Sequence, residues 1–370
     1  MDLRFNLYKA KFDILDKLTK VIFDSQRVER INIFISLDDV YYQCKNSKVN
    51  REFECCGNIA PRQLVSNVLN LVAHYREWAT RKGANVKVFA YYTLASVFEN
   101  RTFLYNYREH YNDRSDKDNP DCYYVNSCIR EGAGILSTIS EYIESAYVVD
   151  TRGMEPSVFP LLCSQEFGDM NADWNFLITR DIFEFQYSYL PKFSVICPKG
   201  DNTTLITSGT LWEYIAEKEK VSGRHLTRYP DRMFPVALAI VGDKKRSIPK
   251  VKGLSWRTIF NIMDNIIDEN PDLDGFSYVS KLVQSFEDRK FDMNMISTNI
   301  DLSQVATNIL TVNEVTKANI RSQLIDVPDY NNLLELNNRM DMFATCPINL
   351  RFLTRQNEVK SINPFKLNYS

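Results

Sequence analysis

Two apolar segments separated by a long amphipathic helix constrain the fold of this chain more than any other feature. Residues 31–35 (INIFI) and 85–92 (NVKVFAYY) are rich in β-branched and aromatic residues, which favours buried strands. Between them, residues 61–82 place apolar side chains at helical spacing, begin with Pro61 and end before Gly83. A strand, a helix and a strand in this order predict a parallel crossover unit. We therefore expect an α/β fold with a parallel sheet flanked by helices.

Composition limits the classes of function that fit the chain. It has 370 residues, 44% of them hydrophobic, and a formal net charge of −2, so any basic surface must be local. The eight cysteines lack paired CxxC spacing and only three histidines occur, which argues against zinc and favours reduced thiols in an intracellular protein. No secretory leader and no apolar run of about 18 residues is found, so we expect no membrane contact and a cytoplasmic or virion-associated location.

A second informative segment covers residues 236–259 (VALAIVGDKKRSIPKVKGLSWRTI). An apolar helix is expected to end at Gly242, and a new helix is expected to begin behind Ser255, a good N-cap. The N-terminus of such a helix, with a glycine beside it, presents free backbone N–H groups that can bind phosphate. Basic side chains around the turn would attract a phosphate backbone. The candidate nucleic-acid-binding residues are Lys244, Lys245, Lys250, Lys252, Gly253, Ser255 and Arg257.

This segment resembles the helix-three-turn-helix of the flap-endonuclease and 5'-nuclease superfamily, a PIN-like family. The family pattern reads roughly L-x-G-D-x-S-D-N-I-P-G-V-x-G-I-G-x-K-T-A. Where that pattern keeps a metal-binding aspartate, this chain has Arg246, so a cation replaces a carboxylate. The positions in register, without gaps, are Gly242, Asp243, Ile248, Pro249, Val251, Gly253 and Thr258.

Two further motifs extend the resemblance. Residues 153–158 (GMEPSV) lie where the family carries G-x-E-A-D-D, and Glu155 is retained. Residues 175–186 (NFLITRDIFEFQ) match the family's T-x-D-x-D-x-x-Q, and both Asp181 and Gln186 are retained. The other acids of the family, including those at the ends of the first two strands, are replaced. Their positions hold Ser36, Tyr91, Ser157, Val158, Phe183 and Arg246.

These replacements bear on chemistry, because two-metal phosphodiester hydrolysis needs a cluster of carboxylates around hard divalent ions. In this register only Glu155, Asp181 and Asp243 survive, as vestigial candidates for a catalytic site. Arg246 would repel magnesium and pair with Asp181 or Glu155, and the ring of Phe183 would fill the site with apolar atoms. We therefore expect no metal cofactor.

The surviving acids also admit other interpretations. Glu155 could serve as a charge at a helix start, and Asp181 could hold a turn through side-chain hydrogen bonds. Conversely, Asp38 or Asp39, just beyond the first strand, could reach inward if the register were shifted. An active enzyme would then hold magnesium or manganese. Its ligand set would be Asp38, Asp39, Glu155, Asp181 and Asp243.

The resemblance implies three parts. They are an N-terminal helical extension (1–30), a PIN-like α/β domain (31–230) with an insertion at about 98–145, and the helix-three-turn-helix with a helical C-terminal lobe (231–370). The family inserts a clamp for single-stranded DNA at the same place, where this chain mixes aromatic residues with cations. Acidic residues dilute that positive field, so we favour a long ordered surface insertion.

Local patterns add detail. Residues 193–197 and 203–207 are expected to be short strands at the sheet edge, and residues 210–213 (TLWE) read as a capping box that opens a helix. Amphipathic helices are expected at 7–23 and in the C-terminal part. The latter cover 276–286, 301–310, 315–324 and 330–342.

Three hypotheses for function follow. The favoured one is a catalytically degenerate 5'-nuclease-like protein, a pseudo-nuclease that binds DNA through residues 244–257 or serves as a phage structural or assembly component. The alternative is an active magnesium-dependent 5'-3' exonuclease or flap endonuclease. A second alternative is a protein-interaction scaffold without nucleic-acid binding. The asparagine- and tyrosine-rich composition resembles that of degenerate nuclease-like chains of large tailed phages, so other phage proteins are candidate partners.

Overall fold

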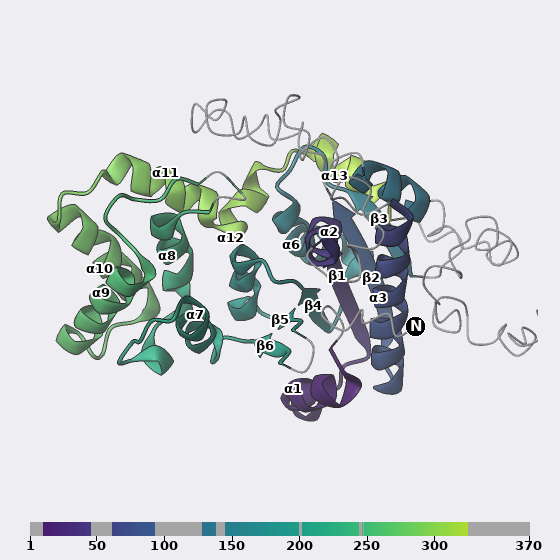
Figure 1. The fold of residues 1–370 in the computed structure, drawn as a ribbon, viewed down its shortest axis with the longest axis horizontal. Coiled ribbons are helices and arrows are strands. Elements are labelled where there is room, and N and C mark those ends of the chain that lie inside the picture. The colour runs from purple at the N-terminus through teal and green to yellow at the C-terminus, as the bar shows by residue number, and fades with distance from the viewer. Residues whose placement is uncertain are drawn as a thin grey trace, which may run out of the picture.

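The computed structural model describes residues 10–45, 61–92, 128–137, 145–199, 202–243, 246 and 248–324. In this part of the chain a six-stranded sheet lies beside a lobe made of helices (Figure 1). The strand order is β3-β2-β1-β4-β5-β6. The strands are β1 (Arg30–Ser36), β2 (Asn85–Tyr92), β3 (Ala146–Asp150), β4 (Trp174–Ile178), β5 (Phe193–Cys197) and β6 (Thr204–Ile206).

The sheet is parallel except at one edge. β1 pairs in parallel with both β2 and β4, and β3 and β5 extend the sheet in the same direction. β6 pairs with β5 in the antiparallel sense, so the sheet is mostly parallel, with one antiparallel edge strand whose direction was not predicted. The reason is the short connection between these two strands, because a parallel neighbour requires a crossover of a dozen or more residues.

The crossover between the two central strands confirms the strand, helix and strand pattern. α3 (Pro61–Arg81) joins β1 to β2, and Gly83 follows the helix with a φ of 77°. A second helix, α2 (Leu37–Lys45), begins directly after β1 and was not predicted. It places its first turn at the carboxyl end of the central strand.

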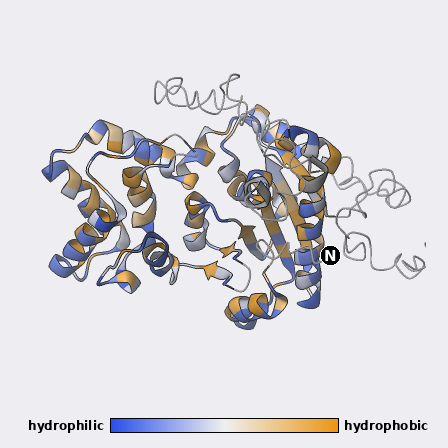
Figure 2. Cartoon of the chain, viewed as in Figure 1, coloured by the Kyte–Doolittle hydropathy of each residue, from blue (hydrophilic) through white to orange (hydrophobic). Residues whose placement is uncertain are grey.

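Side chains of the strands alternate between two buried faces. On β1, Ile33 and Ile35 pack in one cluster with Trp78 of α3, whereas Phe34 points to the other face and stacks on Phe89 at 4.9 Å between ring centroids. Figure 2 shows hydrophobic residues along the strands. Burial on both faces is typical of a mostly parallel sheet.

The helical lobe follows the sheet in the sequence and then returns to it. Its helices are α7 (Leu211–Glu219), α8 (Phe234–Val241), α9 (Trp256–Glu269), α10 (Gly275–Asp288), α11 (Met293–Ser303), α12 (Val305–Asn308) and α13 (Glu314–Arg321). Behind α13, the Gln323 side chain accepts a hydrogen bond from the Asp150 backbone N–H at 2.8 Å and donates one to the Asp150 carbonyl at 3.1 Å. The end of the lobe is thereby attached to the edge strand β3.

Several local expectations need correction. The hydroxyl of Thr210 accepts a hydrogen bond from the Thr207 N–H and donates to the Leu205 carbonyl, so it does not cap α7 and the capping box is wrong. The helix expected at 301–310 is broken, since α11 ends at Ser303 and α12 begins at Val305. The helix expected at 330–342 and the stretch 98–120 of the insertion lie outside the described residues.

The N-terminal helix packs against α3 of the sheet domain. α1 (Phe12–Ser25) begins later than the predicted residue 7, and residues 7–9 lie outside the described part. The ring of Phe12 stacks on His74 of α3 at 4.6 Å. Among the described helices, none combines the length and the apolar character that crossing a membrane requires.

Candidate functional site

The carboxyl ends of the central strands bring together the first two sequence-predicted positions. Ser36 and Tyr91 are paired at the ends of β1 and β2. The Tyr91 hydroxyl is buried and donates a 2.7 Å hydrogen bond to Oε1 of Glu184, which is also buried. Burial, together with the negative charge of Glu184, raises the pKa of Tyr91 well above its ordinary value, so this hydroxyl stays a donor.

Asp39 joins the end of β1 to the end of β4. Its carboxylate accepts hydrogen bonds from the Thr179 hydroxyl at 2.6 Å and from the Arg180 backbone N–H at 3.2 Å. Its own N–H donates to Ser36 Oγ at 3.4 Å. Asp38, the other acid of the shifted register, is only partly buried in the first turn of α2. The first turn of α2 thus positions Asp39, rather than Asp38, against β4.

Asp181 holds the turn that follows β4, as one interpretation of the sequence suggested. Its Oδ1 accepts a hydrogen bond from the Phe183 N–H at 3.0 Å and caps the 3-10 helix η6 (Ile182–Tyr189). Gln186, within η6, donates to the Phe183 carbonyl and accepts from the Val305 N–H at 3.3 Å. The retained motif therefore connects the sheet to α12 of the helical lobe.

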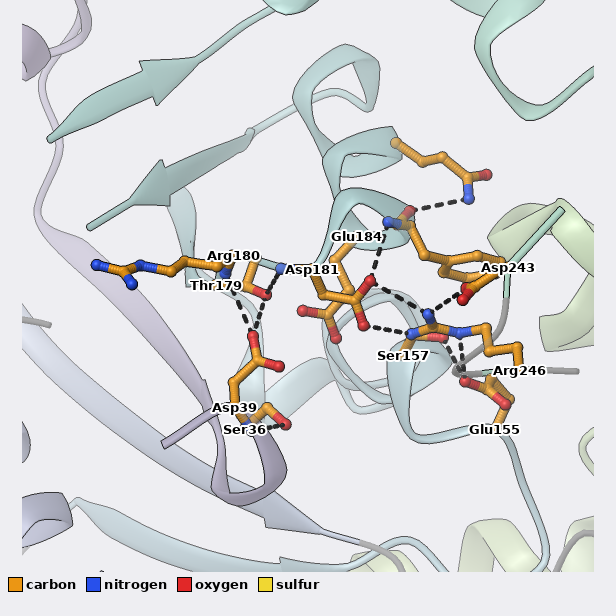
Figure 3. Close-up of polar contacts among 12 residues, drawn as sticks. Ser36, Asp39, Glu155, Ser157, Thr179, Arg180, Asp181, Glu184, Asp243 and Arg246 are labelled. Carbon is orange, nitrogen blue, oxygen red and sulfur yellow. Dashed lines mark hydrogen bonds and ion pairs between the residues drawn. The ribbon is translucent and has the colours of Figure 1, made fainter. Parts of the chain in front are cut away.

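The Arg246 guanidinium lies at the centre of the three surviving acids (Figure 3). Its Nε donates to Glu155 Oε1 at 3.0 Å, and its Nη1 donates to Asp243 Oδ2 at 2.8 Å. Its two terminal nitrogens donate to the two oxygens of Asp181 at 3.2 and 2.9 Å, which is the bidentate geometry that arginine favours. The structure thus brings Glu155, Asp181 and Asp243 together around a cation.

The ring of Phe183 completes this cluster. The Arg246 Cζ lies 3.8 Å from the ring centroid, and Phe183 is fully buried. Ser157, at another position where the family has an acid, donates a 3.0 Å hydrogen bond to Glu155. The two residues that sequence reasoning placed in the would-be metal site, Arg246 and Phe183, therefore do lie beside Asp181.

A short loop carries Arg246 into this position. Gly242 ends α8 with a φ of 75°, and Asp243 and Ile248 exchange two backbone hydrogen bonds of 2.9 Å that close the loop. Inside it, the Arg246 N–H donates to the Asp243 carbonyl at 3.2 Å. The guanidinium is therefore directed back towards the α/β domain by local backbone geometry.

The cluster is nearly closed to solvent. The exposed fractions of the side chains are 5% for Arg246, 5% for Glu155, 7% for Asp181 and 12% for Asp243. Burial by itself would lower the pKa of the Arg246 guanidinium, but the charges of Asp181, Asp243 and Glu155 raise it well above its ordinary value. The arginine is therefore permanently charged here.

These residues do not fit a divalent metal ion in the arrangement found. The guanidinium occupies the place on which the three carboxylates converge, and its charge would repel a second cation. Within the described residues, no group of three or more His, Cys, Asp and Glu side chains forms a set that would hold a metal. Asp39 is directed to Thr179 and the β4 turn.

Among the described candidate nucleic-acid-binding residues, Ser255 and Arg257 belong to the start of α9, and Lys250, Lys252 and Gly253 precede it. Ser255 caps this 14-residue helix, and its hydroxyl accepts from the Thr258 N–H at 3.4 Å. Exposed cations gather around the helix start, beside Gly253, whose φ is 83°. Those that the structure describes are Lys250, Lys252 and Arg257, while Lys244 and Lys245 lie outside the described residues.

Sequence reasoning missed Glu184. This acid lies in the matched segment 175–186 but at a position where the family pattern has no acid. Its signal was a single acidic residue between Phe183 and Phe185 in an apolar run, which indicates a buried, hydrogen-bonded carboxylate.

Comparison with known proteins supports the fold. Among solved structures, the chain is similar to T5 5'-exonuclease with bound divalent metal ions (zinc), with a TM-score of 0.51 and 16% sequence identity. The match covers 81% of this chain and 100% of that one. No protein-family model and no curated protein matches the sequence. The predicted 5'-nuclease-like, PIN-like α/β fold is therefore confirmed, and at this identity the similarity speaks for the fold alone.

Proposed function

We propose that this chain, which has a 5'-nuclease-like fold, is a pseudo-nuclease that binds DNA without hydrolysing it. One observation carries this proposal: Glu155, Asp181 and Asp243 bind the Arg246 guanidinium in a nearly solvent-free cluster. Carboxylates used in this way are unavailable to the two divalent ions that clamp the attacking and leaving oxygens in hydrolysis.

The residues that replace the family's acids support the same conclusion. Tyr91 donates to Glu184, Ser157 donates to Glu155, and Arg246 donates to three acids. Each of these three replacements donates a hydrogen bond to a carboxylate oxygen. Buried charges need such partners, so the arrangement is that of a stable polar core.

DNA binding is supported by the start of α9. Free backbone N–H groups at a helix N-terminus and its positive dipole end favour phosphate, and Lys250, Lys252 and Arg257 add exposed positive charge there. Phosphate contacts of this kind carry no base readout, so we expect binding that is insensitive to sequence.

Nuclease assays should find no cleavage. We expect purified protein to leave 5'-flap and 5'-tailed DNA intact in magnesium or manganese, because no pair of ions can be held with Arg246 in place. The readout is product formation on a denaturing gel, with Asp181→Ala measured in parallel. Cleavage by the wild type that is lost in Asp181→Ala would favour the alternative of an active 5'-3' exonuclease or flap endonuclease.

Charge reversal at the loop should weaken DNA binding. With Lys250→Glu and Lys252→Glu combined, two phosphate contacts are lost, so the slope of log affinity against log salt should become shallower by roughly 1.8 on duplex DNA. Fluorescence anisotropy at several salt concentrations measures both the affinity and the slope.

A matched control for this variant is Lys17→Glu with Lys20→Glu, the same charge change on exposed positions of α1, which lies away from α9 in Figure 1. The control should change the slope far less. If the wild type shows weak binding with a flat salt response, the scaffold alternative without nucleic-acid binding is favoured instead.

A further inference from the structure

The Arg246 cluster connects the segment between α8 and α9 to the α/β domain. Besides Asp243 in its own loop, the guanidinium binds Glu155, 91 residues away in the sequence, and Asp181, 65 residues away. Glu155 precedes the 3-10 helix η4 (Pro156–Val158), and Asp181 follows β4. One side chain therefore links the segment between α8 and α9 to two separate segments of the sheet domain.

A cation is required at this point. Three carboxylates directed at one buried place repel each other strongly, because the low local dielectric screens them weakly. Without positive charge between them, the Asp243 end of the loop would be pushed away from Glu155 and Asp181.

The size of a guanidinium is close to that of a hydrated divalent ion. Hydrogen bonds of 2.8–3.2 Å to Nε, Nη1 and Nη2 put the carboxylate oxygens about 4 Å from Cζ. Magnesium and manganese that keep their first-shell waters reach carboxylates through water at about 4 Å as well. The two cations would therefore demand a similar arrangement of the three acids.

We propose that Arg246 takes the place of a divalent cation, so that the loop keeps its phosphate-binding arrangement without any metal. The inference rests on the proposed function, because one of its measurements is DNA affinity. It deepens the proposed function by stating that DNA binding does not depend on divalent ions. Arg246 acts here as a positioning residue: it is buried and orders the loop from which Lys250 and Lys252 reach solvent.

The test is rescue by metal. Arg246→Ala should lose about tenfold or more in DNA affinity in EDTA. It should regain most of this affinity in manganese, because a hydrated ion can enter the space that the side chain leaves. The wild type should bind DNA equally well in both solutions. The measurements are fluorescence anisotropy with a short duplex, thermal unfolding with and without manganese, and electron paramagnetic resonance of bound manganese.

Two controls make the rescue specific. Arg246→Ala combined with Asp181→Asn removes one carboxylate of the cluster and should show neither manganese uptake nor rescue. Arg246→Lys keeps a positive charge and should take up no manganese. If Arg246→Ala is unfolded in EDTA, its refolding on addition of manganese, followed by circular dichroism, is the same test.

The possible outcomes separate this inference from the proposed function. The inference would be overturned if DNA binding by the wild type depended on manganese, or if Arg246→Ala bound DNA as tightly as the wild type in EDTA. It would also be overturned if Arg246→Ala neither bound manganese nor became more stable in its presence. If the wild type binds no DNA at all, the proposed function fails, while thermal unfolding and resonance still decide whether Arg246 replaces a divalent ion.

Discussion

Replacing Arg246 with alanine should lower the free energy of unfolding by about 3–5 kcal/mol when no divalent ion is present, because the variant leaves buried carboxylates without their cation. The Arg246 side chain is only 5% exposed, so water cannot compensate for the loss without reorganising the cluster. Urea denaturation in EDTA, followed by circular dichroism, measures the change.

The size of this effect depends on burial, and a matched pair of variants tests that. Arg152 also binds an aspartate, Asp150, but its side chain is 66% exposed. Arg152→Ala should therefore cost at most about 1 kcal/mol. Equal losses for the two variants would contradict the account of the Arg246 cluster as a buried network.

Neutralising the whole cluster separates charge from packing. A variant that combines Arg246→Met with Glu155→Gln, Asp181→Asn and Asp243→Asn removes the cation and the repelling charges together. It should recover much of the stability that Arg246→Ala loses, because no buried charge is left uncompensated and the new amide groups can hydrogen-bond one another. A variant as unstable as Arg246→Ala would show that the hydrogen-bond geometry, rather than the charge balance, stabilises the loop.

The main features of the site could be predicted because they lie in contiguous motifs. Gly242, Asp243 and Arg246 belong to one stretch whose register with a nuclease pattern has no gaps. The register places Arg246 in the same site as Asp181. In the structure, both terminal nitrogens of Arg246 donate hydrogen bonds to the Asp181 carboxylate. The strands β1, β2, β5 and β6 and the helix α3 were equally accessible, since their apolar periods are local, whereas β3 was not predicted.

What the sequence could not show were contacts set by the fold. The hydrogen bond from Tyr91 to Glu184 joins residues 93 positions apart, and that from Thr179 to Asp39 joins residues 140 apart. Neither depends on a local pattern, because each joins elements that only the fold brings together. The first contact joins β2 to η6, and the second joins α2 to the residue that follows β4. The strand β6 was predicted but its antiparallel direction was not, because an apolar run does not encode its direction relative to β5.

Gly242→Ala should destabilise the protein by about 3 kcal/mol, because two separate penalties coincide at this residue. Its φ of 75° and ψ of 165° lie in a backbone region that is nearly restricted to glycine, so a residue with a Cβ is disfavoured there by about 1–3 kcal/mol. In addition, a Cβ at this position would lie 2.7 Å from both the Ile248 carbonyl oxygen and the Lys250 nitrogen. Overpacking of this kind typically costs about 1–3 kcal/mol more. Both neighbouring atoms are backbone, so the loop itself must move.

Gly253 provides a control that lacks the second penalty. Its φ of 83° is similar, but a Cβ at Gly253 would meet no atom within 4 Å. Gly253→Ala should therefore cost only the conformational penalty of about 1–2 kcal/mol, and it should leave the Arg246 contacts in place. Urea denaturation of both variants compares their losses of stability. DNA affinity should fall further in Gly242→Ala than in Gly253→Ala, since the loop that Gly242 begins carries Arg246 and Lys250. Equal effects of the two substitutions on stability and on DNA affinity would mean that the close approach at Gly242 does not hold the loop.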